Sequence, residues 1–167
     1  MKTFRNFIDD INESSMTRLK SQSDKGGTAV MSASRGDKSN KENRARAKKL
    51  DKDIRGKFGK GATKVTGKYD EKDDKTGQTK RVKERSHVIQ SGKMGKRKFK
   101  KAVKSLGKKY GQDSVITQQK GSKDATLKRT RKGAMSKHNM KLGKMRPGRS
   151  GENETQKKGK TFTYDTK

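Results

Sequence analysis

The chain has 167 residues, of which 48 are Lys or Arg and 18 are Asp or Glu, so its formal net charge is +30 at pH 7. Only 23% of the residues are hydrophobic and 40% are charged. This composition overlaps that of disordered proteins and leaves little apolar surface for a core. The absence of Cys excludes disulfides, thiolate metal sites and Cys nucleophiles. Such an excess of positive charge repels itself, so a polyanion is the expected partner.

The first 27 residues are predicted to form two segments outside the folded domain. Apolar residues recur near the start at helical spacing: Phe4, Phe7, Ile8 and Ile11. This spacing is typical of an amphipathic helix, so residues 1–13 are predicted to be a detachable leader. Residues 14–27 are rich in Ser, Lys, Gln and Gly and are predicted to be a flexible linker.

Residues 28–119 are predicted to form a small α+β domain. An apolar run at residues 28–33 indicates a buried strand. The spacing of Ser39 and Glu42 is that of a capping box, and apolar residues then recur at three- and four-residue steps as far as Gly59. A helix is therefore predicted between the capping box and this glycine.

Alternating patterns predict two antiparallel strands at residues 62–69 and 79–90. A second amphipathic helix at 99–110 and a strand at 114–117 complete the domain. Residues 120–167 are predicted to be a basic extension with three short edge strands: 125–130, 140–145 and 160–164. The order of elements predicts the fold class α+β, a split β-α-β-β-α-β-like sandwich with a small core and helices on one face of a mostly antiparallel sheet.

Clustered basic residues predict a nucleic-acid interface. On the second predicted helix, basic residues lie opposite the apolar stripe and form one cationic face that would suit a phosphate backbone. The residues predicted to bind nucleic acid are Arg81, Lys83, Arg85, Lys96, Arg97, Lys100, Lys101, Lys104, Lys108, Lys109, Arg129, Arg131 and Lys132. Aromatic residues, at 5% of the chain, are too sparse for a base-stacking platform. We therefore expect binding through phosphates without sequence specificity, to DNA rather than RNA.

The candidate for catalysis is a carboxylate and imidazole pair, Glu84 and His87. Residues three apart on a strand point to opposite faces, which argues against their cooperation. An ion pair of Glu84 with a neighbouring basic residue is the preferred interpretation. No metal-ligand spacing involves His138, and no segment has the full Walker pattern. The sequence thus predicts no enzyme, no metal and no cofactor.

The N-terminus resembles a known targeting peptide. Met1-Lys2-Thr3-Phe4, Phe7 and Ile11-Asn12-Glu13 are similar to the capsid-targeting leader of internal head proteins in T-even-like tailed bacteriophages. In that family the leader directs the protein into the prohead, and the head-maturation protease cuts after a Glu preceded two positions earlier by Leu or Ile. The resemblance implies cleavage between Glu13 and Ser14. It also implies contacts of the leader with the prohead scaffold or core and with the protease.

Most of the remaining chain is similar to a small phage-encoded domain family of unknown function. The resemblance is carried by Met31-Ser32-Ala33, Arg35-Gly36-Asp37, Glu42-Asn43, Glu84-Arg85-Ser86 and Gly111-Gln112-Asp113-Ser114-Val115. It implies a folded domain and no particular activity.

Together these features predict a phage internal head protein, a basic virion protein that matures by proteolysis and binds packaged DNA non-specifically. It would lie inside the capsid, enter the host cytoplasm with the genome, and have no membrane partner. Two alternatives stay open. One is an RNA-binding accessory protein of a ribonucleoprotein, and the other is an injected enzyme or host-takeover effector. An injected enzyme predicts that Glu84→Gln abolishes an activity and leaves DNA affinity intact.

Overall fold

A computed structural model describes residues 16–72, 75–131, 139–151 and 154–164. Its elements are β1 (Thr28–Ser32), α2 (Asn40–Phe58), β2 (Thr63–Lys72), β3 (Thr79–Gln90), α3 (Lys96–Lys109), β4 (Ser114–Gln118), β5 (Asp124–Arg129), β6 (Met140–Pro147), β7 (Glu154–Lys157) and β8 (Lys160–Tyr164). Each strand and helix expected between residues 28 and 164 is present, and β7 is an addition. The amphipathic helix expected at residues 1–13 lies outside the described residues. No helix in these ranges is long and apolar enough to cross a bilayer.

Both ends of α2 form as the sequence indicates. The hydroxyl of Ser39 accepts a hydrogen bond from the Glu42 backbone N–H at 3.2 Å, and the Glu42 carboxylate accepts one from the Ser39 backbone N–H at 2.8 Å. These two bonds satisfy amides that have no partner within the helix. At the other end Gly59 has a φ of 70°, a left-handed conformation that glycine adopts at little cost. The predicted capping box and stop signal are both confirmed.

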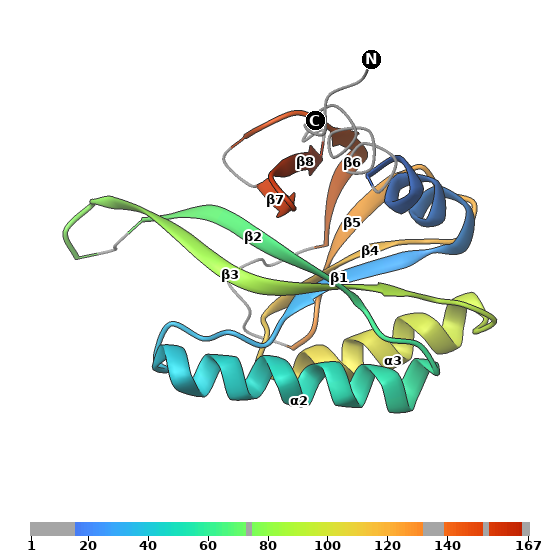
Figure 1. The fold of residues 1–167 in the computed structure, drawn as a ribbon, viewed down its shortest axis with the longest axis horizontal. Helices are drawn as coiled ribbons and strands as arrows, with labels where there is room; N and C mark the ends of the chain where they lie inside the picture. The colour runs from blue at the N-terminus through green and yellow to red at the C-terminus, as the bar shows by residue number, and fades with distance from the viewer. Residues whose placement is uncertain (1–15, 73–74, 132–138, 152–153, 165–167) are drawn as a thin grey trace, which may run out of the picture.

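The strands of the described chain close into an antiparallel barrel in the order β1-β3-β2-β7-β8-β6-β5-β4 (Figure 1). The predicted α+β sandwich with short edge strands in a basic extension is therefore wrong. Strands β5, β6 and β8 continue the sheet from β4, and β7 returns to β2 through three residue pairs. Closure removes the free edges that β2 and β4 would expose in an open sheet.

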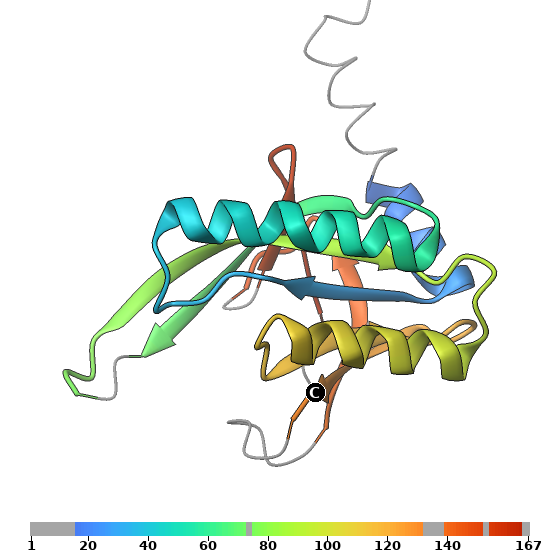
Figure 2. The ribbon, with the colours of Figure 1, turned by 90° about the horizontal axis from the view of Figure 1, so that it is seen from below.

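Two apolar clusters hold the barrel and the helices together. Helices α2 and α3 lie along one side of the barrel (Figure 2) and cover its outer surface. The outer cluster contains Ala29, Met31, Leu50, Ile54, Ile89, Phe99, Val103, Leu106 and Val115. The inner cluster fills part of the lumen and contains Met16, Leu19, Val30, Val65, Val88, Met145 and Phe162. The sheet thus buries both faces, which explains how so few apolar residues suffice.

Residues 16–26 are helical, in place of the expected flexible linker. Met16 and Leu19, three residues apart, share one face of this helix and are buried in the inner cluster. The hydroxyl of Ser91 donates to the carbonyl oxygen of Gly26 at the end of the helix. Two apolar residues are too few to predict a helix from periodicity, but they have a place to pack inside the barrel.

Candidate active site

The lumen of the barrel contains a cavity of about 680 Å³, and all the strands contribute to its wall. Its apolar lining includes Val30, Ile116, Leu127, Met140 and Leu142. Its polar lining is Ser32, Lys68, Tyr69, Glu84, Ser86, Gln112, Ser114, Glu154, Thr155, Thr163 and Tyr164. A cavity lined by apolar side chains together with polar groups is the usual form of a small-molecule site.

Alternation along β3 separates its lumen-facing residues from its outer residues. Glu84 and Ser86 line the cavity, whereas Lys83 and Arg85 are exposed on the outside. His87 is buried on the outer face, toward α2. Burial lowers the pKa of His87, and the nearby carboxylate of Asp51 opposes this shift. The expectation that Glu84 and His87 point to opposite faces is confirmed, so they do not form a catalytic pair.

A second carboxylate, Glu154 on β7, pairs in register with Lys68 on the outer face of the barrel and is compensated by two cations. Its Oε1 lies 3.3 Å from Lys68 Nζ and 3.4 Å from a guanidinium nitrogen of Arg81. Burial raises the pKa of Glu154, but the hydrogen bond and charge of Lys68 and the charge of Arg81 outweigh it, so the pKa lies below its ordinary value. Arg81 also binds Asp70 at 2.9 Å and donates to the Gly151 carbonyl oxygen at 3.1 Å. These contacts fasten the seam between β2 and β7.

Tyr164 on β8 adds a neutral phenol to the wall. Burial raises its pKa, so the phenol keeps its proton at neutral pH. Its ring meets that of Phe162 edge-on, with centroids 5.9 Å apart. Within the described ranges no group of three or more His, Asp or Glu is placed to hold a metal ion. The lumen therefore offers the Glu84 carboxylate, hydroxyls and phenols beside apolar side chains, a combination that suits a small organic cation.

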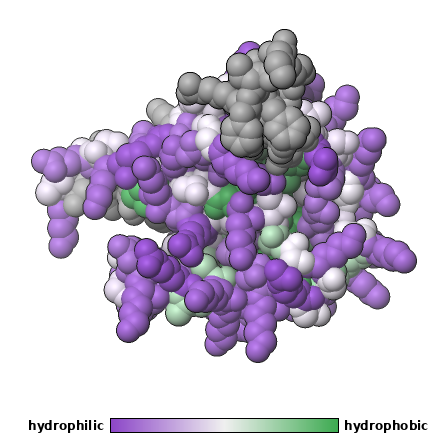
Figure 3. Space-filling view, viewed as in Figure 1, coloured by the Kyte–Doolittle hydropathy of each residue, from purple (hydrophilic) through white to green (hydrophobic). Residues whose placement is uncertain are grey.

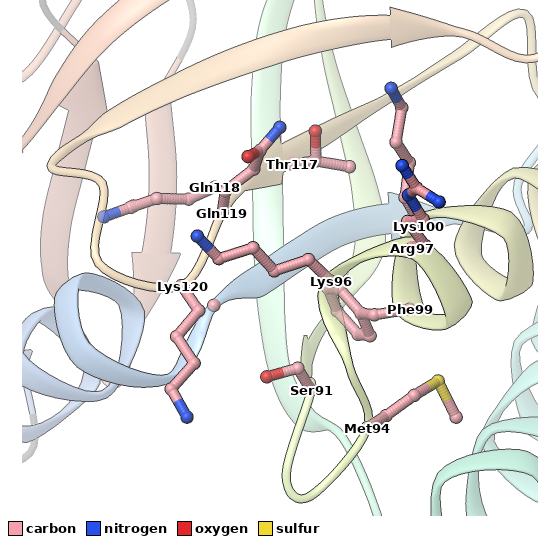
Figure 4. Close-up of a pocket in the computed structure, with 11 residues that line it drawn as sticks. Ser91, Met94, Lys96, Arg97, Phe99, Lys100, Thr117, Gln118, Gln119 and Lys120 are labelled. Carbon is pink, nitrogen blue, oxygen red and sulfur yellow. The ribbon is translucent and has the colours of Figure 1, made fainter.

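A second, smaller cavity of about 270 Å³ lies between the start of α3 and the turn after β4 (Figure 4). It is lined by Lys96, Arg97, Lys100 and Lys120 and by no carboxylate. Lys96 extends across the opening toward the turn, whereas Arg97 and Lys100 stand together on the far side in Figure 4. This cavity shares no lining residue with the lumen.

The residues predicted to bind nucleic acid lie on the outside of the molecule, and none of those described lines the lumen. Those on α3 are exposed, opposite the buried residues Phe99, Val103 and Leu106, as the helical pattern predicts. Arg81 is paired with Asp70, Lys109 with Asp53 at 2.8 Å, and Arg131 with Asp113. The remaining members on the described chain are Lys83, Arg85, Lys96, Arg97, Lys100, Lys101, Lys104, Lys108 and Arg129. Lys132 and the predicted cleavage residues Glu13 and Ser14 lie outside the described residues.

Comparison with known proteins decides the family. The model of the S-adenosylmethionine lyase family matches residues 29–167. The chain belongs to this family. No curated protein matches the chain. A solved phage SAM lyase, in complex with S-methyl-5′-thioadenosine, is 19% identical with a TM-score of 0.38, and the match covers 70% of this chain and 88% of that one.

Membership of the S-adenosylmethionine lyase family corrects the functional prediction. The resemblance to internal head proteins was wrong, and so was the expectation of no enzyme, because a lyase family consists of enzymes. The prediction of a DNA-binding virion protein is therefore wrong, and the RNA-binding and host-takeover alternatives are not supported either. The expected partners, nucleic acid, prohead scaffold and protease, give way to a small molecule. The location inside a capsid and the division at residues 13, 27 and 119 stay untested predictions.

The lumen residues of this family member were largely missed by sequence reasoning. Glu84 was considered as a partner of His87 or of a neighbouring basic residue, and Gly67, Tyr69 and Ser86 were assigned no role in binding or catalysis. One signal was present: Gly67 and Tyr69 share a face of the predicted hairpin, as Glu84 and Ser86 do. A glycine, two hydroxyls and a carboxylate on faces that should build a core indicate a wall that binds a polar ligand.

Proposed function

We propose that the chain cleaves S-adenosylmethionine (SAM) in the barrel lumen by breaking the bond between sulfur and Cγ of the methionyl arm. Family membership over residues 29–167 is the observation that carries the proposal. The lumen supports it because it is large enough for a nucleoside with a side arm and combines a carboxylate with an apolar wall. No other cavity described above has carboxylates to meet a cationic substrate.

The choice of bond follows from the chemistry of a lyase, which breaks a bond without water. Of the three carbons bonded to sulfur, the methionyl Cγ belongs to the arm that carries an anionic nucleophile, the carboxylate, which can reach Cγ by closing a five-membered ring. One carboxylate oxygen attacks Cγ, the C–S bond breaks, and sulfur takes its electron pair. The products are S-methyl-5′-thioadenosine (MTA) and a five-membered lactone that retains the amino group. No proton is gained or lost, and no residue has to act as acid or base.

The apolar side chains of the lumen favour this step. The carboxylate loses its negative charge and the sulfonium its positive charge as the reaction proceeds. Water solvates the two opposite charges of the reactant more strongly than the transition state, in which they are partly neutralised, and so it slows the reaction. A medium of low polarity stabilises the charged reactant less, so the reaction is faster there. Val30, Ile116, Leu127 and Leu142 provide such a medium. The barrel would therefore act by excluding water and by folding the methionyl arm on itself.

The proposed activity is tested by the fate of water oxygen. Full-length protein incubated with SAM in ¹⁸O-labelled water should give equimolar MTA and lactone, and the oxygen bonded to Cγ should be unlabelled. Label in a γ-hydroxyl would show that water attacks Cγ, which contradicts a lyase. An unsaturated four-carbon acid would indicate loss of a β-proton to a base and would overturn the ring closure. Mass spectrometry separates the three outcomes.

We expect the KM for SAM to fall as ionic strength rises. The protein carries a formal charge of +30, Figure 3 shows hydrophilic side chains over most of one face, and SAM has a net charge of +1 at neutral pH. Their repulsion is screened over about 10 Å at 0.1 M salt and about 30 Å at 0.01 M. A decrease in KM of about threefold or more between these concentrations is expected. The inhibition constant of MTA, which is uncharged, serves as control and should stay constant; a KM that rises with salt contradicts the prediction.

A further inference from the structure

The second cavity, between the start of α3 and the turn after β4, is surrounded by positive charge (Figure 4). Lys96, Arg97 and Lys100 reach it from the first two turns of α3, and Lys120 reaches it from the turn. No Asp or Glu lines it, and none of these four side chains forms an ion pair with another residue of the described chain. Four unpaired cations around one cavity favour the binding of an anion.

The start of α3 adds to this positive charge. The first amides of a helix have no partner within the helix, and the helix dipole is positive at this end. In α2 the Ser39 hydroxyl and the Glu42 carboxylate compensate for both effects. In α3 the N-cap residue Gly95 makes no side-chain hydrogen bond, and the first turn has no acidic residue. A bound anion would therefore supply the negative charge that this helix end lacks.

The basic side chains around the cavity also lie close enough to repel a neighbour. Burial lowers the pKa of Lys128 on β5, and the charge of Lys100 lowers it further. Lys128 does not line the cavity, so the excess of positive charge extends beyond the cavity wall. An anion bound beside Lys100 would reduce this repulsion.

The wall of the cavity also offers apolar surface and a hydrogen-bond acceptor. Met94 and Phe99 contribute the apolar part. Gln118, which is only 2% exposed, donates from Nε2 to Asp24 Oδ1 and to the Ser122 carbonyl oxygen, each at 2.8 Å. These two bonds fix the amide group, and its Oε1 is buried without a hydrogen-bond partner on the described chain. Buried polar atoms are usually paired, so a ligand that donates to this oxygen would stabilise the site.

We propose that this cavity binds a phosphorylated sugar. The dianionic phosphate would accept hydrogen bonds from the lysine ammonium groups and, through two of its oxygens, from the Arg97 guanidinium. A sugar hydroxyl would donate to Gln118 Oε1, and the carbon skeleton would lie against Met94. A phosphate ion alone would leave both the apolar wall and the Gln118 oxygen without a contact.

An enclosed cavity suits a terminal phosphate better than the backbone of a nucleic acid. A phosphomonoester carries up to two charges at the end of a small molecule, whereas a phosphodiester carries one and continues on both sides. The cavity volume of about 270 Å³ is close to the lower limit for small-molecule sites. This site is independent of the proposed lyase activity, because it shares no lining residue with the lumen.

Isothermal titration calorimetry of the full-length protein with three probes tests the ligand class. The probes are ribose 5-phosphate, inorganic phosphate and ribose, each titrated at about 0.15 M salt to screen the general charge of the protein. Ribose 5-phosphate should bind with a stoichiometry of one and about tenfold more tightly than inorganic phosphate, because the sugar adds a hydrogen bond and apolar contact. Ribose alone should not bind detectably. Equal affinity for ribose 5-phosphate and inorganic phosphate would overturn the assignment, as would no binding of either.

A pair of double variants of α3 tests the position of the site. Lys96→Gln combined with Lys100→Gln should weaken ribose 5-phosphate about tenfold or more, because two charged hydrogen bonds are lost. The matched control is Lys104→Gln combined with Lys108→Gln, which removes the same charge at the same spacing from exposed positions that do not line the cavity. The control should change the affinity by less than about threefold. Equal weakening by both pairs would mean that ribose 5-phosphate responds to net charge alone, which overturns the site.

Competition with MTA separates this site from the lumen. Saturating ribose 5-phosphate should leave the dissociation constant of MTA unchanged, and the Lys96→Gln, Lys100→Gln variant should form MTA from SAM at the wild-type rate. Displacement of MTA by ribose 5-phosphate would place the sugar phosphate in the lumen and overturn the inference. Wild-type protein that binds ribose 5-phosphate but consumes no SAM would refute the proposed function and leave this site intact.

Discussion

Replacing Glu84 with Gln is expected to lower kcat/KM for SAM by about 100-fold or more, because it removes the charge that pairs with a cationic group in a partly enclosed site. Glu84 lines the lumen directly opposite Gly67 in the β2–β3 ladder. Glutamine keeps the length and shape of the side chain and can still accept a hydrogen bond, so the loss would report the charge. Initial rates of MTA formation over a range of SAM concentrations give kcat and KM separately.

Asp37→Asn is the matched control for Glu84→Gln. It changes the net charge of the protein by the same amount, but Asp37 lies on an exposed loop, where it pairs with Arg35 at 2.8 Å. Its kcat/KM should equal that of the wild type. Equal far-ultraviolet circular dichroism and thermal unfolding of both variants would exclude loss of fold. Full activity of Glu84→Gln would show that the charge of Glu84 has no part in binding the substrate.

The elements that sequence reasoning located are those whose signals are local. The ends of α2 are marked by Ser39, Glu42 and Gly59, all within the helix or next to it. The buried stripe of α3 follows from apolar spacing alone. Such signals depend only on residues a few positions apart, so they can be recognised even in a chain with few apolar residues.

Closure of the barrel depends on contacts that the local pattern does not reveal. The sequence of β7 is Glu154–Lys157, which contains no apolar residue, and it joins β2 from more than 80 positions away. The seam is held instead by backbone pairing and by the ion pairs of Glu154 with Lys68 and Arg81. Charged residues are the most abundant class in this chain, so these particular ones could not be distinguished in advance.

Because of the high net charge, the sequence-based prediction of function relied on the outer surface of the protein and not on the lumen. A charge of +30 predicts a polyanionic partner, but the basic residues of α3 and β3 point outward while the lumen carries the Glu84 carboxylate. The net charge sums the residues of the outer surface and of the lumen, so it does not reveal that the two differ. The informative residues were few: a glycine and a serine at lumen-facing positions of β2 and β3, where an ordinary core would have apolar side chains.

Phe162→Ala is expected to destabilise the protein by about 3–5 kcal/mol, as for other buried phenylalanines cut back to alanine. Phe162 on β8 has no exposed surface and packs in the inner cluster with Val30, Val65 and Val88 of the first three strands. Typical domains have only about 5–15 kcal/mol of total stability. The variant should therefore lose a large part of its folding free energy, measured by chemical denaturation with circular dichroism.

This prediction separates the closed barrel from the sandwich that the sequence indicated. In a sandwich, residues 160–164 would form an edge strand of a peripheral extension, and removing one ring there would cost less than about 1 kcal/mol. Met140→Ala is the comparison, because Met140 is 51% exposed and should cost no more than about 1 kcal/mol in either fold. A Phe162→Ala variant as stable as Met140→Ala would mean that β8 does not close the lumen. The cavity would then lose Thr163 and Tyr164 from its wall, and with them part of the enclosure that the proposed reaction requires.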